Sequence, residues 1–415
     1  MNRAGAAAAI LLLWCTGVLG AEQKEAAPPT DWPKTISQLQ QEVYRRPGFA
    51  QPRQQLAIAH NNYGVGLGDQ RQWADAIREL EEAIQLEPDN ADFRGNLGRV
   101  YFNKAKQEYD GRQMEQALAT LEQVIKLAPE FAPAYALKGE IEYGRQRLKE
   151  AKAAWQRSAA LDPSQTYLAE RLQQVTEELP VESGFERLSQ AYFDLRYEEG
   201  VERQTGFDIQ DALVEARRTV GADFADWPKY RLVVLIYSAE SFRKLREETP
   251  EWVAGQFDGK IRVPLPSAQL DPLAVKRIIF HEYTHALVSE LSDGRCPTWL
   301  NEGLAEYEGW RHGTQRFEAL RKAYQDNQLV PWVQLSDLFS AHQPVDQVRL
   351  GYEESHSIAA YLIERYGFWR IRKILNALRQ ERPWEEMLAE EFHIKLPRLQ
   401  TSWREWLSTY LAKPS

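Results

Sequence analysis

Five consecutive residues carry the side chains of a metal-dependent hydrolase. His281 and His285 stand four positions apart, and Glu282 directly follows the first histidine. Side chains four apart on an α-helix lie one above the other, so both imidazoles can reach one metal ion. Glu282 is turned about 100° from His281, beside the metal rather than on it. Bound zinc lowers the pKa of water to about 7, so this carboxylate can act as general base. The pattern predicts one Zn²⁺ ion and hydrolysis of a peptide bond.

A catalytic zinc site needs a third protein ligand, and Glu302 offers one. A turn at Asp293-Gly294 and a second helix beginning near Thr298 would bring Glu302 beside the two histidines. Glu306 follows one helical turn later, where its carboxylate can accept the remaining ring hydrogen of a zinc-bound histidine. We therefore expect three metal ligands, the two histidines and Glu302, with Glu306 as an orienting residue behind them.

Two neighbouring helices within residues 272–310 must position these side chains. Asp271 can cap the first helix, and Pro272 suits its first position because a proline there loses no helical hydrogen bond. The residues from Leu273 to Leu291 contain no helix breaker. The first helix should therefore carry the two histidines and the general base on one uninterrupted element.

The linked motifs resemble the gluzincin zinc metallopeptidases, especially the peptidase MA-like group related to thermolysin and the M1 aminopeptidases. The resemblance covers about residues 184–415. It implies an α+β domain with a small sheet and a helical C-terminal part at about 316–415. The metzincin pattern does not fit, because Val288 and Leu291 stand where it requires glycine and histidine.

This resemblance also implies a donor that stabilises the oxyanion of the tetrahedral intermediate. Tyr352 and His356 are the candidates, just before a helix that should end near Tyr366, and we prefer Tyr352. M1 aminopeptidases carry a Gly-Ala-Met-Glu-Asn motif, whereas residues 254–259 read Ala-Gly-Gln-Phe-Asp-Gly. The missing motif slightly favours an endopeptidase over an aminopeptidase.

Two segments before the metal helices read as strands. Residues 231–237 are rich in branched apolar side chains, as in a buried strand, and residues 261–266 form a second candidate. Pro264 would confine the second strand to a sheet edge, because proline cannot donate a ladder hydrogen bond. A free edge could bind an extended substrate through main-chain hydrogen bonds.

An internal repeat precedes this region. Three prolines each follow an alanine by twelve positions, and a large apolar residue stands four positions after each alanine. The prolines are Pro88, Pro129 and Pro163, the alanines Ala76, Ala117 and Ala151, and the apolar residues Leu80, Leu121 and Trp155. The pattern resembles the tetratricopeptide repeat, with three units over about residues 57–164. It implies an all-α solenoid with a concave surface for a protein partner.

Details of the repeat give further expectations. Gly64, Gly98 and Gly139 should mark close helix crossings, and the middle unit carries seven extra residues around 107–111 that we expect to lengthen a loop. An amphipathic helix over residues 167–179 should cap the stack and end at Pro180. The repeats and this cap would occupy residues 57–179, after a leading helical segment within 22–56.

The N-terminus reads as a signal peptide over residues 1–21. Arg3 supplies a positive start, residues 6–14 are apolar, and small residues follow at 18–21. We expect an exported protein that is either located in the periplasm or cell envelope or secreted. An uncleaved anchor, which alone would give membrane contact, is the alternative. Residues 22–35 are expected to form a flexible tether. Cleavage would leave Cys296 as the only cysteine, which excludes an internal disulfide.

Bulk composition narrows the function classes. The chain has 415 residues, of which 43% are hydrophobic and 27% charged, and a net charge of −9. Acidity without a basic block argues against nucleic acid as a partner. We expect an exported zinc peptidase whose repeats recruit a substrate or partner protein. The alternatives are a non-catalytic interaction scaffold and a zinc hydrolase of a non-peptide substrate.

Overall fold

The computed structural model describes residues 31–245, 256–265, 271–313, 315–340, 343–380 and 382–412. These residues form two compact units, which meet in the chain between Pro180 and Val181. The expected signal peptide and most of the expected tether lie outside the described residues. Within the described ranges, no helix combines the length and the apolar character needed to span a membrane.

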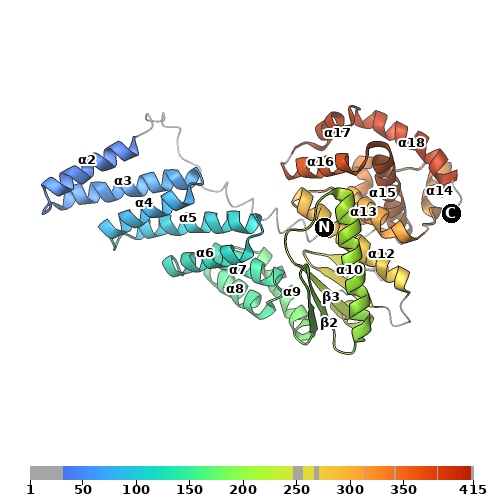
Figure 1. Ribbon diagram of the computed structural model, residues 1–415, viewed down its shortest axis with the longest axis horizontal. Coiled ribbons are helices and arrows are strands. Elements are labelled where there is room, and N and C mark those ends of the chain that lie inside the picture. The colour runs from blue at the N-terminus through green and yellow to red at the C-terminus, as the bar shows by residue number, and fades with distance from the viewer. Residues whose placement is uncertain are drawn as a thin grey trace. The chain divides into compact units, whose positions relative to one another are not determined.

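The described residues of the N-terminal unit form helices and no strands (Figure 1). They are α2 (Trp32–Arg45), α3 (Ala50–Asp69), α4 (Trp73–Leu86), α5 (Ala91–Asp110), α6 (Met114–Leu127), α7 (Ala132–Gly144), α8 (Leu148–Leu161) and α9 (Tyr167–Glu182). Residues 32–35 are helical, so the expected tether is shorter than predicted, and the helix that contains the expected start of the first repeat begins at Ala50. Pro180 does not end α9, which continues through two further residues to Glu182.

Helix pairs in this unit cross where small residues meet large ones. A Cβ atom on Gly64 would lie 2.7 Å from Leu80, and one on Gly139 would lie 2.3 Å from Trp155. The expectation for Gly98 was wrong, because a Cβ atom there would meet only Ala128 at 3.7 Å. The middle unit's extra residues lengthen a helix rather than a loop, since α5 has 20 residues and α7 has 13.

The C-terminal unit contains a five-stranded mixed sheet in the order β1-β2-β3-β5-β4. Its strands are β1 (Glu186–Ser189), β2 (Phe193–Tyr197), β3 (Leu232–Ser238), β4 (Gln256–Phe257) and β5 (Ile261–Leu265). The strands β2, β3 and β5 run parallel, whereas β1 and β4 pair antiparallel with their neighbours. The predicted edge position of β5 was wrong at its start, because β4 pairs with Ile261 and Arg262. Pro264 is tolerated in the ladder beyond these pairs.

The central strand β3 is buried on both faces, as its unbroken apolar run predicts. Leu232, Val234 and Ile236 join the main core, in which α10 (Arg203–Phe224) and α12 (Pro272–Ser292) also take part. The alternate residues of β3 pack on the opposite face with Phe242 of α11 (Ala239–Leu245). Because successive side chains of a strand point to opposite faces, α12 packs against only one face of the sheet.

Helices complete the C-terminal unit (Figure 1). They are α13 (Thr298–Gly309), η1 (Trp310–His312), α14 (Glu318–Gln325), η2 (Trp332–Phe339), α15 (Val345–Tyr366), α16 (Phe368–Arg379), α17 (Trp384–Phe392) and α18 (Leu396–Ala412). Their core contains Trp332, whose ring centroid lies 5.5 Å from that of Trp299 and 5.9 Å from that of Trp403. The architecture confirms the predicted fold class, a helical repeat followed by a small sheet and a largely helical domain.

Candidate metal centre

Helix α12 has the predicted start and stop signals. The Asp271 side chain accepts a hydrogen bond from the backbone N–H of Leu273, and Pro272 occupies the first turn. Asp293 adopts a left-handed conformation with φ 54°, and Gly294 follows with φ 72°. This left-handed pair ends α12 and lets the chain return as α13. The local sequence therefore explains why the two helices lie side by side.

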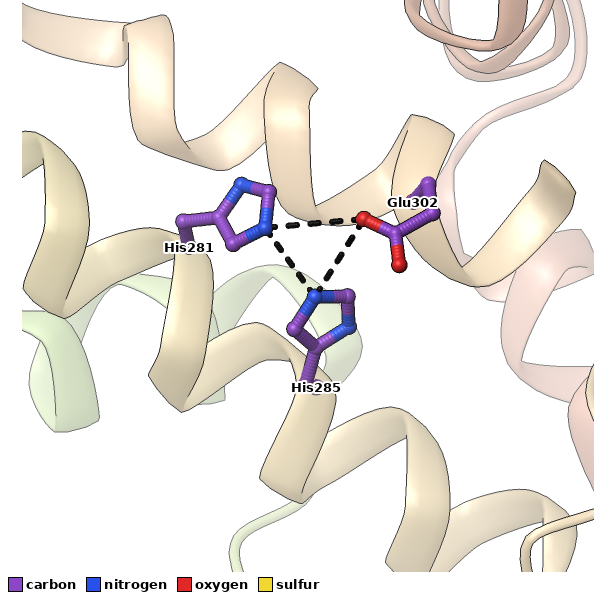
Figure 2. A group of neighbouring side chains, drawn as sticks. All are labelled: His281, His285 and Glu302. Atoms are coloured by element: carbon purple, nitrogen blue, oxygen red, sulfur yellow. Dashed lines mark hydrogen bonds and ion pairs between the residues drawn. The ribbon is translucent and has the colours of Figure 1, made fainter. Parts of the chain in front are cut away.

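Three side chains converge between α12 and α13 (Figure 2). The Nε2 atoms of His281 and His285 are 3.0 Å apart. The Oε2 atom of Glu302 lies 3.6 Å from Nε2 of His281 and 3.5 Å from Nε2 of His285. One ligand atom from each side chain therefore lies within 4.8 Å of the others, a spacing at which the group could hold a metal ion.

The donor set itself fits a transition metal. Two imidazole nitrogens and one carboxylate oxygen form the ligand type that zinc takes in catalytic sites, with one coordination position left open. Among the described residues, Oε2 of Glu302 and Nδ1 of His285 are buried without a hydrogen-bond partner. A buried carboxylate oxygen aimed at two ring nitrogens is costly unless a cation or proton satisfies it. The residues present therefore fit the ion that their types suggest.

The Glu302 carboxylate and the two histidines shift one another's pKa values. Burial alone would raise the pKa of Glu302, but His285 and His281 outweigh it and bring the pKa far below its ordinary value. Burial alone would lower the pKa of His281, but the neighbouring carboxylates of Glu302 and Glu306 raise it well above its ordinary value. The Glu302 carboxylate is thus held ionised, as a metal ligand must be.

Glu306 lies behind His281, one turn after Glu302 on α13. Its Oε1 atom is 3.1 Å from Nδ1 of His281. Because Nε2 of His281 faces the group of three, Nδ1 is the atom left to carry the ring hydrogen. Burial would raise the pKa of Glu306, but its hydrogen bond to His281 lowers it, so a charged acceptor faces this hydrogen.

Glu282 follows His281 on α12 and is 3% exposed. Burial raises the pKa of its carboxyl group above the ordinary value. The positive charge available to His281 and His285 opposes this shift, whereas the carboxylates of Glu302 and Asp258 add to it. A buried carboxylate with a raised pKa, one residue from a metal-type histidine, has the chemistry of a proton acceptor.

Tyr352 lies inside α15, rather than before a helix as the sequence suggested. Its ring packs edge-on against Phe339, with 5.0 Å between ring centroids. Burial raises the pKa of Tyr352 well above its ordinary value, and the carboxylates of Glu302, Glu306 and Glu282 raise it further. The structure thus brings the phenol into the electrostatic reach of the group, where it keeps its proton and can donate it in a hydrogen bond.

His356 lies one turn further along α15, in an aromatic environment. Its ring is 5.1 Å from that of Phe317 and 6.0 Å from that of Tyr307, and its Nε2 atom is 3.4 Å from the hydroxyl of Tyr410. Burial lowers the pKa of His356 to about 4, so the ring is neutral at physiological pH. Three carboxylates, those of Glu302, Glu306 and Glu282, shift the pKa of Tyr352, whereas only that of Glu306 shifts the pKa of His356.

Asp258 is a neighbour of the group that the sequence reading missed. It begins the turn between β4 and β5, in which Gly259 has φ 96°, and its Oδ2 atom accepts a hydrogen bond of 3.1 Å from Nε of Arg262. The Asp-Gly pair is a hairpin signal that could have revealed this turn.

Comparisons with known proteins agree with both parts of this architecture. Residues 249–409 match the Peptidase MA superfamily, residues 69–104 match a TPR repeat family and residues 102–166 match a tetratricopeptide repeat family. The comparison with curated proteins finds no match.

The comparison with solved structures finds matches of low sequence identity. The first TPR of Spaghetti (RPAP3), bound to an HSP90 peptide, is 20% identical and matches 30% of this chain and 93% of its own, with a TM-score of 0.22. MamA from Desulfovibrio magneticus RS-1 is 20% identical and matches 37% of this chain and 88% of its own, with a TM-score of 0.23. The chain thus carries a Peptidase MA superfamily domain at residues 249–409, preceded by TPR repeats within residues 69–166.

Proposed function

We propose that this protein is an exported zinc-dependent peptidase whose repeats recruit a protein substrate or partner. The observation that carries the proposal is the convergence of His281, His285 and Glu302, with the buried carboxylate of Glu282 next to them. The Peptidase MA superfamily match over the same residues supports a peptidase. Export rests on the N-terminal sequence alone, and N-terminal sequencing of the mature protein from the periplasmic fraction tests it.

The proposed chemistry assigns one role to each side chain. When bound, Zn²⁺ would act as a Lewis acid that activates water and polarises the substrate carbonyl. Glu282 accepts the proton of the attacking water and passes it to the leaving amine, and its raised pKa makes it a stronger base for this exchange. The Tyr352 hydroxyl donates a hydrogen bond to the developing oxyanion. Glu306 orients His281 through Nδ1.

Endopeptidase activity is favoured over aminopeptidase activity. An aminopeptidase needs an acidic side chain free to bind the substrate's amino terminus. Asp258 is the acidic neighbour of Glu282 on the β4–β5 turn, and Arg262 already pairs with it. Arg262 thus engages the Asp258 carboxylate within the protein, while it also pairs with Glu182. We expect internally positioned peptide bonds to be cleaved, with blocked and unblocked peptides hydrolysed at similar rates.

Metal removal and restoration test the proposal. A chelator should abolish peptide hydrolysis by the full chain, and stoichiometric Zn²⁺ should restore it. His281→Ala and Glu302→Ala should each lose bound zinc and turnover together. His312→Ala is the matched control, because its ring pairs with Glu215 at 3.4 Å and lies outside the group of three. Activity that survives zinc removal would refute a zinc peptidase.

The same assay separates the alternatives. A non-catalytic scaffold predicts bound zinc without turnover of any peptide, and a zinc hydrolase of another class predicts turnover of ester or amide substrates but not of peptides. For the repeats, we expect deletion of residues 57–166 to spare cleavage of short peptides and to impair cleavage of a native protein substrate. Equal loss of both activities would contradict a recruiting role.

A further inference from the structure

Trp310 contacts the orienting carboxylate behind the candidate metal centre. It directly follows α13 and stands four residues after Glu306, so its side chain can turn back over the preceding turn. Its Nε1 atom donates a hydrogen bond of 2.8 Å to Oε2 of Glu306. The other oxygen of the same carboxylate, Oε1, faces Nδ1 of His281 at 3.1 Å. The carboxylate is therefore bound at both of its oxygens.

The indole ring is itself held from α12. The guanidinium carbon of Arg277 lies 4.2 Å from the centroid of the Trp310 ring, within cation–π distance. Arg277 stands one turn before His281 on the same helix. The contacts thus form a closed path from Arg277 to Trp310, from Trp310 to Glu306, and from Glu306 back to His281.

Close packing of the two helices makes this path possible. A Cβ atom on Gly309 would lie 3.2 Å from the carbonyl oxygen of Arg277 and 3.3 Å from Cβ of His281. Both distances are shorter than ordinary van der Waals contact, so glycine allows the end of α13 to lie directly on α12. Trp310 directly follows Gly309, so this close approach also brings Trp310 near α12.

We propose that Trp310 is a positioning residue that fixes the rotation of the Glu306 carboxylate, and thereby the tautomer and orientation of His281 at the metal. This inference rests on the zinc site proposed above. Oε2 has two donors, Nε1 of Trp310 at 2.8 Å and Nε2 of Gln315 at 3.5 Å. The indole N–H makes the shorter bond, and this bond restricts the rotation of the carboxylate. The indole N–H does not titrate, so it donates over the whole working pH range.

Zinc affinity of the full chain, measured by competition with a chromophoric chelator, tests this role. Trp310→Phe keeps a smaller aromatic ring near Arg277 and removes the N–H donor, and we expect about tenfold weaker zinc binding. Trp406→Phe is the matched control, because it removes an indole N–H that donates to Glu364 at 3.3 Å. This control should bind zinc as the wild type does.

Two further measurements distinguish positioning from general destabilisation. In a Glu306→Ala background, Trp310→Phe should cause no additional loss of zinc affinity, because the carboxylate through which Trp310 acts is gone. The visible absorption of the Co²⁺-loaded protein should shift in Trp310→Phe and stay unchanged in Trp406→Phe. Arg277→Gln keeps the N–H but removes the cation, and it should weaken zinc binding by about two- to threefold.

The possible failures have different meanings. Zinc binding by Trp310→Phe within twofold of wild type, or an equal loss in the Glu306→Ala background, would overturn the role of Trp310 and leave the zinc peptidase intact. A wild-type chain that binds no zinc would overturn both the proposed function and this inference.

Discussion

Gly303 offers the most precise perturbation of the helices that carry the candidate site. It lies in α13 next to Glu302, and its missing side chain lets α15 approach. A Cβ atom on Gly303 would be 2.3 Å from the carbonyl oxygen of Ser355 and 2.7 Å from its carbonyl carbon. Both neighbours are backbone atoms, so no side-chain rotation can relieve the clash.

The size of the effect follows from these distances. Gly303→Ala must separate α13 from α15 by about 1 Å, and overpacking of this kind costs about 1–3 kcal/mol. The better helix propensity of alanine returns at most about 1 kcal/mol, so the net change is destabilising. Because Glu302 is on α13 and Tyr352 on α15, the same movement draws Tyr352 from the metal centre. A misplacement near 1 Å costs about 100-fold in rate.

Urea denaturation and peptide turnover measure the two effects separately. Gly95→Ala is the matched control, since it lies in helix α5 with no atom within 4 Å of an added Cβ atom. The control should gain up to about 1 kcal/mol in stability and keep full activity. If Gly303→Ala were as stable and as active as Gly95→Ala, the close α13–α15 contact would not position the site.

Three further predictions concern other parts of the C-terminal unit. Tyr352→Phe should lower kcat by about 100- to 1,000-fold with little change in KM, because the hydroxyl acts on the oxyanion alone; an unchanged kcat in steady-state assays would exclude it as the donor. Burial raises the pKa of Glu354 to about 8, against a hydrogen bond from the N–H of Val330, so the folded state keeps a proton that the unfolded state releases. Stability should therefore fall as pH rises from the ordinary carboxyl range to about 8, by at most about 1.4 kcal/mol per pH unit, and urea titrations of Glu354→Gln should lose this slope. Arg262→Met breaks a buried pair with Glu182, in which Nη1 lies 2.7 Å from Oε1. The free energy of unfolding, measured by urea denaturation, should fall by about 3–5 kcal/mol, because the buried Glu182 loses its cation. An unchanged free energy of unfolding would contradict this.

Much of the metal centre was accessible from sequence because it depends on local signals. The cap at Asp271, the left-handed Asp293 and the four-residue spacing of the histidines are all set within one helix and its turn. Glu302 is a candidate from sequence because the turn at Asp293-Gly294 and the start of α13 place it one helix beyond the histidines. These features need no knowledge of tertiary packing.

Features that depend on packing were missed or misplaced. The strands β1, β2 and β4 are short, and β4 has two residues, so no periodicity marks it. The contact between Trp310 and Glu306 has no sequence signal, because their four-residue spacing does not show that the indole turns back toward the carboxylate. The extra turns of α5 were read as a loop, since repeat spacing gives the number of inserted residues but not their conformation.

The turnover of zinc-loaded Glu282→Gln tests the central claim most directly. The substitution keeps the size of the side chain and removes the general base, and neither histidine nor Glu302 is altered. We predict wild-type zinc content and a kcat lower by about 100- to 10,000-fold, the range that general base catalysis supplies. A Glu282→Gln protein with equal zinc and a kcat close to that of the wild type would contradict the proposed mechanism.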